Sequence, residues 1–392
     1  MDFQYFIPTK ILFGPGKLNE LSKVKLPGTK ALIVISSGNS MRKYGYLDKV
    51  QCLLKENGVQ SLVFDKILPN PVLSSVMEGA SIAKRECCDF VVVLGGGSSI
   101  DAAKSIAVMA TNPGNYWDYI SGGSGGNKPV SKKALPIVAI TTTAGTGTEA
   151  DPWTVITKED TNEKIGFGTE NTFPVLSIVD PELMTSIPPH LTAYQGFDAL
   201  FHATEGYIAN ISTPLSDIFA LKSIELIAQN LSEAVKNGEN IEARTNVALA
   251  STLSGMVEST SSCTSEHSME HALSAYHPEL PHGAGLIMLC ESYYSFFEDK
   301  VAEKFIDMAK AMGEDVDSLP EHKRPHSFIT ALKKLIKNCN VEALKMSDFG
   351  IKEDEIPKIA ENARNTMGGL FTLDRYTLSL DETIEIIKNA YK

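Results

Sequence analysis

Over the first 186 residues, short runs of β-branched and apolar residues alternate with amphipathic stretches. Helical patterns, among them Leu47 to Glu56 and Val76 to Glu86, lie between the first three runs. This alternation is typical of a parallel sheet whose two faces are covered by helices, and it predicts a Rossmann-like α/β domain. The runs are KALIVIS (30–36), SLVFD (61–65), DFVVVLG (89–95), LPIVAIT (135–141) and VLSIVD (175–180).

The second half of the chain has a different pattern. Pro188 and Pro189 interrupt it, and Thr192 and Thr213 are expected to cap the helices that follow. We therefore expect two domains, an α/β domain over 1–186 and an all-helical domain over 187–392. Beyond Thr192 we find no convincing strand, only helical patterns such as Ala193 to Ile208, Pro214 to Gln229, Ile241 to Val257 and Thr383 to Ala390.

Composition excludes several classes of protein. A chain of 392 residues that is 43% hydrophobic can build a large core, and a formal charge of -12 without a run of Lys and Arg argues against nucleic acid as a partner. The sequence shows neither a signal peptide nor a stretch long enough to span a membrane, so we expect a cytoplasmic protein without a membrane partner. The six cysteines form no CxxC pair and are expected to be reduced and mostly buried.

A glycine turn follows the third apolar run, in VVVLGGGSSIDAAKSIA (91–107). Gly96 and Gly97 allow close approach to a phosphate, and the helix that Ser98 or Ser99 opens, with Asp101 in its first turn, favours an anion at its N-terminus. The turn therefore predicts a site for a dinucleotide pyrophosphate, although it is not the G-x-G-x-x-G pattern. A tight turn without a ligand is the alternative.

A second polar loop, TTTAGTGTEAD (141–151), follows the fourth apolar run. Loops at the carboxyl ends of parallel strands converge on one crevice, so Thr142, Thr143 and Thr146 are expected to face the same cofactor as the glycine turn.

The loop after the first run bears on which dinucleotide binds. NAD-specific proteins usually have an acidic residue at this position for the ribose 2'-hydroxyl, whereas a 2'-phosphate requires a cation. Here no acidic residue follows the run, and Arg42 and Lys43 lie close by, so we favour NADP(H) over NAD(H). Alternatively, these two cations only solvate the start of a helix. The candidate cofactor residues of the loop are Ser36, Gly38, Asn39 and Ser40.

Histidines and a carboxylate recur at helical spacing in the second half. Asp198 and His202 are four residues apart, as are His267 and His271, so each pair lies on one face of its helix. His282 follows in LPHGAG, which we expect to be a loop. Nitrogen and oxygen ligands of this kind suit Fe(II), Zn(II), Mn(II) or Co(II), and at most four of them can leave a position open for substrate oxygen.

The same segment contains H-x-x-E-H, the signature of one class of zinc peptidase. That interpretation uses His267, Glu270 and His271 but leaves the glycine turn, the threonine loop and the Asp198/His202 pair without a role. We regard it as a remote alternative, because short patterns recur by chance.

Taken together, the motifs resemble those of the iron-containing (group III) alcohol dehydrogenases, which are related to glycerol dehydrogenase and dehydroquinate synthase. The resemblance implies a dehydroquinate synthase-like architecture with an active site in the cleft between an α/β and a helical domain. It covers nearly the whole chain, from FGPGKL (13–18) through GGGSSIDAAK (95–104), TTAGTGTEA (142–150), SIVDPELM (177–184) and GFDALFHATEGYI (196–208) to EHSMEHALSAYHPELPHG (266–283).

Position by position, the resemblance implies metal ligands at Asp198, His202, His267 and His282, with Fe2+ as the metal and Zn2+ as an alternative. It implies that His271 lies near the nicotinamide and takes part in proton transfer. It also brings Leu183, from SIVDPELM, to the cofactor.

The implied reaction is reversible hydride transfer between NAD(P)H and a small aldehyde or primary alcohol, in a homodimer or larger homo-oligomer. The SSGNS loop resembles that of the NADP(H)-using butanol and aldehyde reductase branch, and Thr141 and Thr148 are mild departures from the family pattern. A glycerol- or other diol-type dehydrogenase is an alternative, as is a nucleotide-binding scaffold with a structural metal.

Overall fold

The computed structural model describes residues 2–392 and divides into two compact units. The α/β unit comprises Ile7–Thr143 and Thr148–Thr185. The helical unit comprises residues 2–6, Ala144–Gly147 and Ser186–Lys392. The domain division expected near residue 187 stays a prediction.

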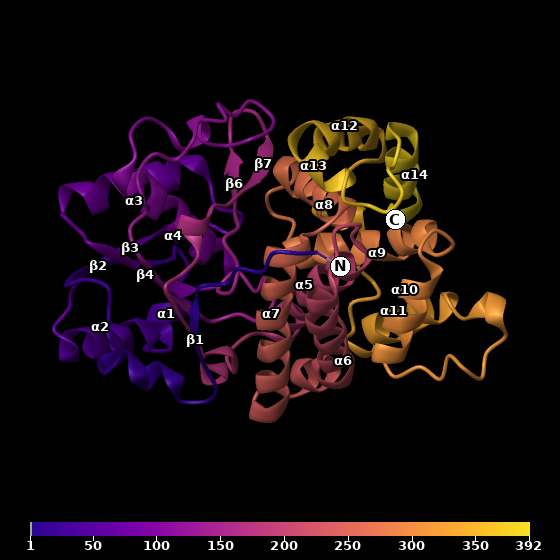
Figure 1. Cartoon of the computed structure of the whole chain (residues 1–392), viewed down its shortest axis with the longest axis horizontal. Helices are drawn as coiled ribbons and strands as arrows, with labels where there is room; N and C mark the ends of the chain where they lie inside the picture. Colours follow the sequence, from indigo (N-terminus) through magenta and orange to yellow (C-terminus); the bar gives the residue numbers. More distant parts are fainter. Residues whose placement is uncertain (1) are drawn as a thin grey trace. The chain divides into compact units, whose positions relative to one another are not determined.

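A parallel sheet forms the centre of the α/β unit (Figure 1). Within residues 2–392, six strands pair in the order β1-β8-β5-β4-β2-β3, and every pair is parallel. All residues of β4 are buried, because helices cover both faces of a sheet built in this way. The elements are β1 (Lys10–Phe13), β2 (Lys30–Ser36), α1 (Ser40–Lys43), α2 (Tyr46–Glu56), β3 (Gln60–Ile67), α3 (Leu73–Arg85), β4 (Phe90–Gly95), α4 (Gly97–Thr111), β5 (Ile137–Thr141), β6 (Thr154–Lys158), β7 (Glu163–Phe167) and β8 (Leu176–Val179).

The α/β fold predicted from the alternating runs is confirmed, and three of its strands were not expected. β1 is a four-residue edge strand that pairs only with β8 among the described residues. β6 and β7 form an antiparallel hairpin. The hairpin contains Lys158, Glu163 and Lys164, and their charge hides the apolar pattern by which a strand is recognised.

The helical unit contains the remaining helices. α5 begins earlier than expected, because Pro188 caps it and Pro189 occupies its first position. The prediction that Thr192 caps this helix is therefore wrong, whereas Thr213 does cap α6 and accepts a hydrogen bond from Ser216 N. The helices are α5 (Pro189–Ile208), α6 (Pro214–Lys236), α7 (Ile241–Ser261), α8 (Ser265–Tyr276), α9 (His282–Phe297), α10 (Ala302–Ala311), α11 (His326–Asn338), α12 (Ile356–Thr366), α13 (Gly368–Phe371) and α14 (Leu380–Ala390).

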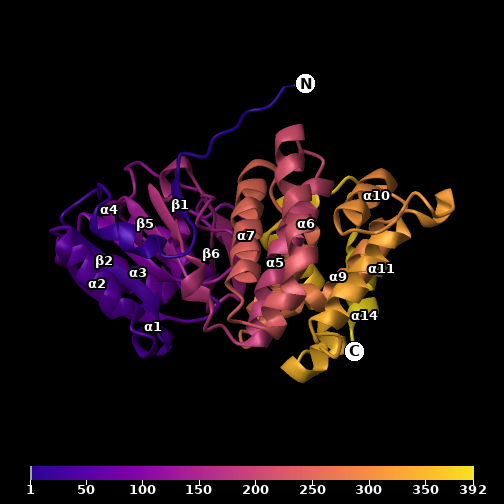
Figure 2. The same ribbon diagram turned by 90° about the horizontal axis from the view of Figure 1, so that it is seen from below.

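Helices α5, α6 and α7 lie side by side in both ribbon views (Figures 1 and 2). The segment Ala144–Gly147 packs against them within the helical unit. Gly147 has a φ of +63°, and a Cβ built on Gly255 of α7 would lie 2.0 Å from the Gly147 carbonyl oxygen. The amide of Ala144 donates to Gln195 Oε1 on α5 at 3.3 Å. This part of the threonine loop is thus held by backbone contact with α7 and by a hydrogen bond to α5.

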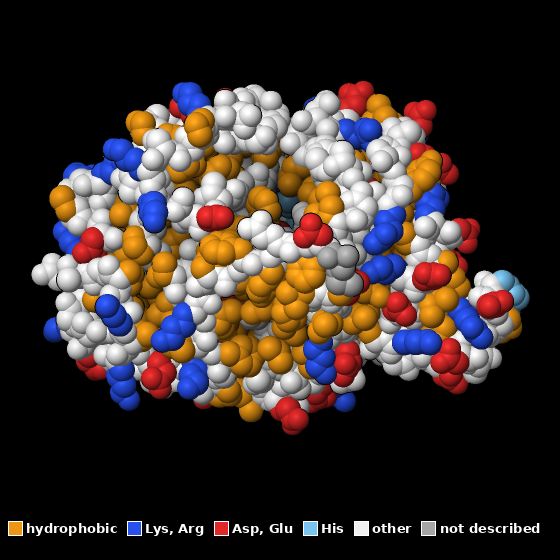
Figure 3. Space-filling model, in the orientation of Figure 1, with side chains coloured by type: hydrophobic (Ala, Val, Ile, Leu, Met, Phe, Trp, Pro, Cys, Tyr) orange, Lys and Arg blue, Asp and Glu red, His pale blue; other side chains and the backbone are white. Residues whose placement is uncertain are grey.

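Among the described residues, no helix is both long and apolar enough to cross a membrane. On the face drawn in Figure 3, Lys and Arg side chains are interspersed with Asp and Glu. This face therefore presents no extended basic surface of the kind that binds nucleic acid.

Candidate functional site

Three helices of the helical unit supply the side chains predicted to bind metal. Asp198 and His202 lie one turn apart on α5, and His267 lies on α8. His282 is the first residue of α9, with Pro281 as its cap, so the expectation that it lies in a loop is wrong. Proline favours this position because its fixed backbone suits a helix start.

These side chains converge on one carboxylate oxygen. Asp198 Oδ1 lies 3.6 Å from His202 Nδ1, 3.7 Å from His267 Nε2 and 3.4 Å from His282 Nε2. For metal bonds of 2.0–2.2 Å at tetrahedral angles, ligand atoms stand roughly 3.3–3.6 Å apart. Among the described residues, Asp198 Oδ1, His202 Nδ1 and His267 Nε2 are buried without a hydrogen-bond partner. Buried polar atoms without partners are costly, so a divalent cation fits this centre.

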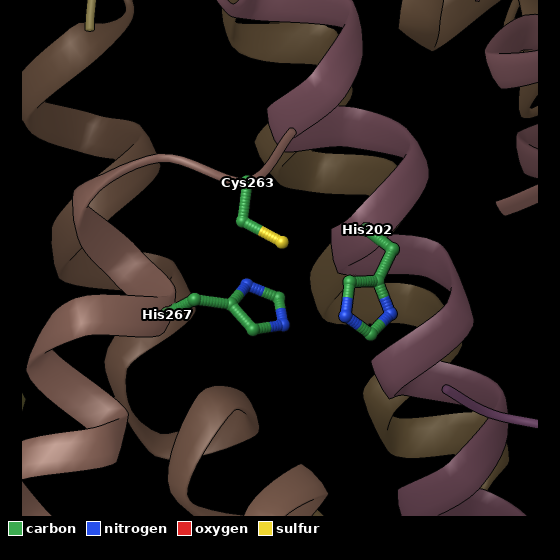
Figure 4. Close-up of side chains that lie close together, drawn as sticks. All are labelled: His202, Cys263 and His267. Atoms are coloured by element: carbon green, nitrogen blue, oxygen red, sulfur yellow. The ribbon is translucent and has the colours of Figure 1, made fainter. Parts of the chain in front are cut away.

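Cys263 lies close to His202 and His267, and the sequence did not single it out. The ring centroids of His202 and His267 are 4.4 Å apart. One ring nitrogen of each histidine and Cys263 Sγ all lie within 4.8 Å of one another (Figure 4). Cys263 is 5% exposed, and burial raises the pKa of its thiol well above the ordinary value. It was expected only to be buried and reduced, because a single cysteine outside a spaced motif gives no signal in the sequence.

The protonation states of Asp198 and His202 suit a cation, whereas neighbouring acidic groups outweigh burial and raise the pKa of His267 and of His282, so a bound cation would have to displace protons there. Burial by itself would raise the pKa of Asp198, but His202 and His282 hold it well below its usual range. Burial lowers the pKa of His202 to about 3, so this imidazole is neutral at pH 7. An ionised carboxylate and a neutral imidazole are the forms that bind metal.

Two buried glutamates orient the histidines, and neither was predicted to do so. Glu205 on α5 accepts a hydrogen bond from His267 Nδ1, and Glu270 on α8 is paired with His282 Nδ1. Both are fully buried. With each Nδ1 engaged, Nε2 faces Asp198 in both histidines, which is the arrangement by which outer carboxylates orient metal-binding imidazoles. Glu270 thus contacts a predicted ligand, a role that the peptidase interpretation does not give it.

His271 lies beside this cluster on α8. Its ring centroid is 5.3 Å from that of His282 and 6.2 Å from that of His267, and its Nδ1 lies 2.8 Å from Met367 Sδ. It is buried, but its ring is not among the groups that face Asp198 Oδ1. One of its ring nitrogens lies within 4.8 Å of ligand atoms of Glu270 and His282, and its role in proton transfer stays a prediction.

In the α/β unit, the loops expected to bind the dinucleotide follow adjacent strands. β5, β4 and β2 are neighbours in the sheet, and the threonine, glycine and serine loops follow them in that order. A Cβ built on Gly96 would lie 2.6 Å from Thr143 Cγ2, so a side chain at this position would close the space between two of the loops. Ser98 and Thr143 are half-buried there, whereas Gly97 and Thr142 are buried.

Asp101, which was also predicted to bind the cofactor, makes its contacts within the protein. α4 begins at Gly97 with Gly96 as its cap, so neither Ser98 nor Ser99 opens it, and Asp101 lies beyond its first turn. Both carboxylate oxygens of Asp101 accept hydrogen bonds, from Thr148 Oγ1 and Val155 N, each at 3.0 Å. Its part in cofactor binding stays a prediction.

Leu183 is 4% exposed and packs in the apolar core of the α/β unit. Thr146 belongs to the segment that packs on α7 in the helical unit. Cofactor contacts of these two residues also stay predictions.

The loop after β2 is largely exposed, and no acidic residue occurs in it. Ser36 ends the strand and is half-buried, Gly38 and Ser40 are exposed, and Asn39 caps α1. Arg42 donates a 2.6 Å hydrogen bond to Asp65, which lies at the irregularity of neighbouring β3. Sequence alone did not indicate that this cation has an acidic partner.

A parallel sheet with a glycine turn at its carboxyl edge, in a chain that also carries a carboxylate–histidine cluster fit for a divalent cation, is typical of a metal-dependent dehydrogenase. Known proteins identify the family. Residues 8–181 match the model of the iron-containing alcohol dehydrogenases, and residues 192–391 match the C-terminal model of the same family. The chain belongs to the iron-containing alcohol dehydrogenase family.

Similar proteins cover almost the whole chain. The 1,3-propanediol dehydrogenase of Klebsiella pneumoniae is 35% identical, over 92% of each chain. The NAD-dependent methanol dehydrogenase of Bacillus methanolicus is 34% identical, over 98% of this chain and 99% of its own. A solved alcohol dehydrogenase from an archaeon of a Red Sea brine pool superposes with a TM-score of 0.93 at 34% identity, over 100% of this chain and 99% of its own.

Proposed function

We propose that this alcohol dehydrogenase interconverts small primary alcohols and aldehydes at the Asp198 centre. Asp198, His202, His267 and His282 would bind the metal, and His271 would transfer the proton. The observation that carries this proposal is the convergence of three imidazole nitrogens on Asp198 Oδ1 at 3.4–3.7 Å, with His271 beside them. Fe2+ is the metal we favour, and Zn2+ suits the same ligands.

The chemistry divides between the bound groups and the side chains. A cation held by these residues would supply Lewis-acid polarisation of the substrate oxygen, and a bound nicotinamide would supply or accept the hydride. Asp198 contributes one negative charge, while Glu205 and Glu270 keep two imidazoles aimed at the centre. In the oxidative direction His271 takes the hydroxyl proton and passes it to solvent. Its Nδ1 contacts Met367, so we assign the proton transfer to Nε2.

For the cofactor we propose NADP(H) in preference to NAD(H), which places the chain with the NADP(H)-using reductase branch. Ser36 at the end of β2, without an acidic neighbour in its loop, leaves space for a 2'-phosphate, and Arg42 is the cation closest in sequence. The pairing of Arg42 with Asp65 counts against this preference, as does the NAD-dependence in the name of the Bacillus methanolicus relative. The glycine and threonine loops would hold the pyrophosphate and nicotinamide of either cofactor.

An absorbance assay tests the reaction and the cofactor together. Anaerobic, Fe2+-loaded protein would be given NADPH or NADH with aldehydes from acetaldehyde to butanal, and 1,3-propanediol in the reverse direction tests the diol alternative. We expect metal-dependent oxidation that favours NADPH. If NADH is favoured, the cofactor proposal fails and the reaction stands. If neither cofactor is consumed with any substrate, the proposed reaction fails.

Two histidine variants separate the roles within the site. We expect His267→Ala to lose bound metal and activity together, whereas His271→Ala retains the metal and loses activity. Metal content measured by mass spectrometry and folding measured by circular dichroism are the readouts. A folded His271→Ala protein without metal would refute this division of roles.

We also propose that the protein is cytoplasmic and forms a homodimer or larger homo-oligomer. All six cysteines lie within the described residues and are free thiols, which suits a reducing compartment.

A further inference from the structure

Cys263 lies in the turn between α7 and α8, next to His202 and His267. α7 ends at Ser261 and α8 begins at Ser265. Within this turn, Ser262 has a positive φ of +63°. This turn brings the Cys263 side chain toward the rings of His202 and His267, as Figure 4 shows. The three potential ligand atoms lie within 4.8 Å of one another, and all three residues are buried.

We propose that Cys263, His202 and His267 form a second metal site, which overlaps the Asp198 centre and takes a thiophilic divalent cation such as zinc or cadmium. A thiolate is a soft ligand and favours such cations, whereas the carboxylate of Asp198 favours harder ones. The two sites would share His202 and His267 and differ in their remaining ligands, Cys263 in one and Asp198 with His282 in the other.

The geometry is close to what such a site requires. Tetrahedral coordination by sulfur and nitrogen places ligand atoms roughly 3.5 Å apart, so the three residues need to close by on the order of 1 Å. Glu258 on α7 brings a carboxylate oxygen to 3.6 Å from His202 Nε2, which offers a fourth ligand. When the cation binds, the S–H bond of Cys263 breaks, a sulfur–metal bond forms, and the proton passes to solvent.

Occupation of the two sites would be mutually exclusive because of His267, whose Nδ1 is held by Glu205 and whose Nε2 cannot bind two ions. His202 faces Asp198 with Nδ1 and Glu258 with Nε2, so it would present a different nitrogen to each site. A thiophilic cation would therefore displace the one at Asp198 by taking His267. Cys263 would then determine which metals the protein retains. The second site shares ligands with the proposed catalytic centre, but its test requires no activity.

The test is a cadmium titration of the metal-free protein, with Cys52 and Cys87 replaced by serine because these two cysteines are exposed. We expect ultraviolet thiolate-to-cadmium charge-transfer absorption that saturates with one equivalent. It should be lost in Cys263→Ser and in Cys263→Ala, and it should persist in Cys290→Ser, the matched control for a buried cysteine. It should also persist in Asp198→Asn, which removes only the oxygen ligand.

The outcomes separate this inference from the proposed function. Absence of the absorption, or an equal absorption in both folded Cys263 variants, would overturn the second site while leaving alcohol oxidation in place. A band that depends on Cys263 in a protein inactive toward every alcohol would support the second site and count against the reaction. As a second readout, zinc added to Fe2+-loaded protein should release iron, and Cys263→Ser should release less.

Discussion

Glu205 controls which nitrogen of His267 faces Asp198. Its carboxylate accepts from His267 Nδ1 and is itself fixed by Thr264, whose N and Oγ1 donate to it at 2.8 and 2.9 Å. We expect Glu205→Gln to weaken metal binding by about 10–100-fold, because an amide can donate to Nδ1 and so favour the wrong tautomer. A chelator competition monitored by metal content measures this change.

The matched control is Glu225→Gln on α6, where the side chain is 38% exposed and pairs with Lys222. It should leave metal affinity unchanged. Equal affinity in Glu205→Gln and the wild type would show that Glu205 only fills space. The sequence did not reveal Glu205, because a glutamate three residues after a predicted ligand is indistinguishable from a solvated helix residue until its burial is known.

At the level of elements, the contact between α7 and the Ala144–Gly147 segment depends on a glycine. A Cβ at Gly255 would lie 2.0 Å from Gly147 O, an overlap that only backbone movement can relieve. We expect Gly255→Ala to destabilise the protein by about 1–3 kcal/mol in spite of the better helix propensity of alanine. Thermal and urea unfolding measure the change.

Gly369 on α13 provides the comparison, since a Cβ there would meet nothing within 4 Å. Gly369→Ala should be neutral or slightly stabilising. If Gly255→Ala behaves in the same way, the segment is not held by this contact. The sequence did not predict the contact, because two distant glycines carry no sign that their backbones touch.

At the scale of the whole molecule, the sequence predicted the elements that bury apolar residues periodically. Strands β2, β4 and β5 and helices α5 to α7 follow directly from such patterns. The β6–β7 hairpin did not, because its buried Glu163 and Lys164 look like surface residues in the sequence. Spacing likewise placed His202 beside Asp198, and the family resemblance pointed to His267 and His282. Neither gave information on side chains brought in by a turn, such as Cys263.

Asp374 links distant parts of the helical unit. It precedes α14, accepts a hydrogen bond from Tyr293 on α9 at 3.0 Å and another from Ser265 N at the start of α8, and has Glu205 nearby. Burial raises its pKa to about 7. Between pH 4 and 7 the unfolded chain loses the Asp374 proton while the folded protein keeps it, so the stability contribution of this group falls as pH rises.

We expect Asp374→Asn, which cannot ionise, to gain stability relative to the wild type between pH 5 and 8, on the order of 2 kcal/mol. Urea unfolding at several pH values measures this change. Glu382 in the same unit gives the contrast, because the Ser379 amide lowers its pKa and it is ionised in both states above pH 5. The difference between Glu382→Gln and the wild type should therefore stay constant over this range. If the Asp374→Asn difference is equally constant, Asp374 is ionised in the folded protein, and its contacts with Tyr293 and Ser265 stabilise the carboxylate rather than the neutral acid.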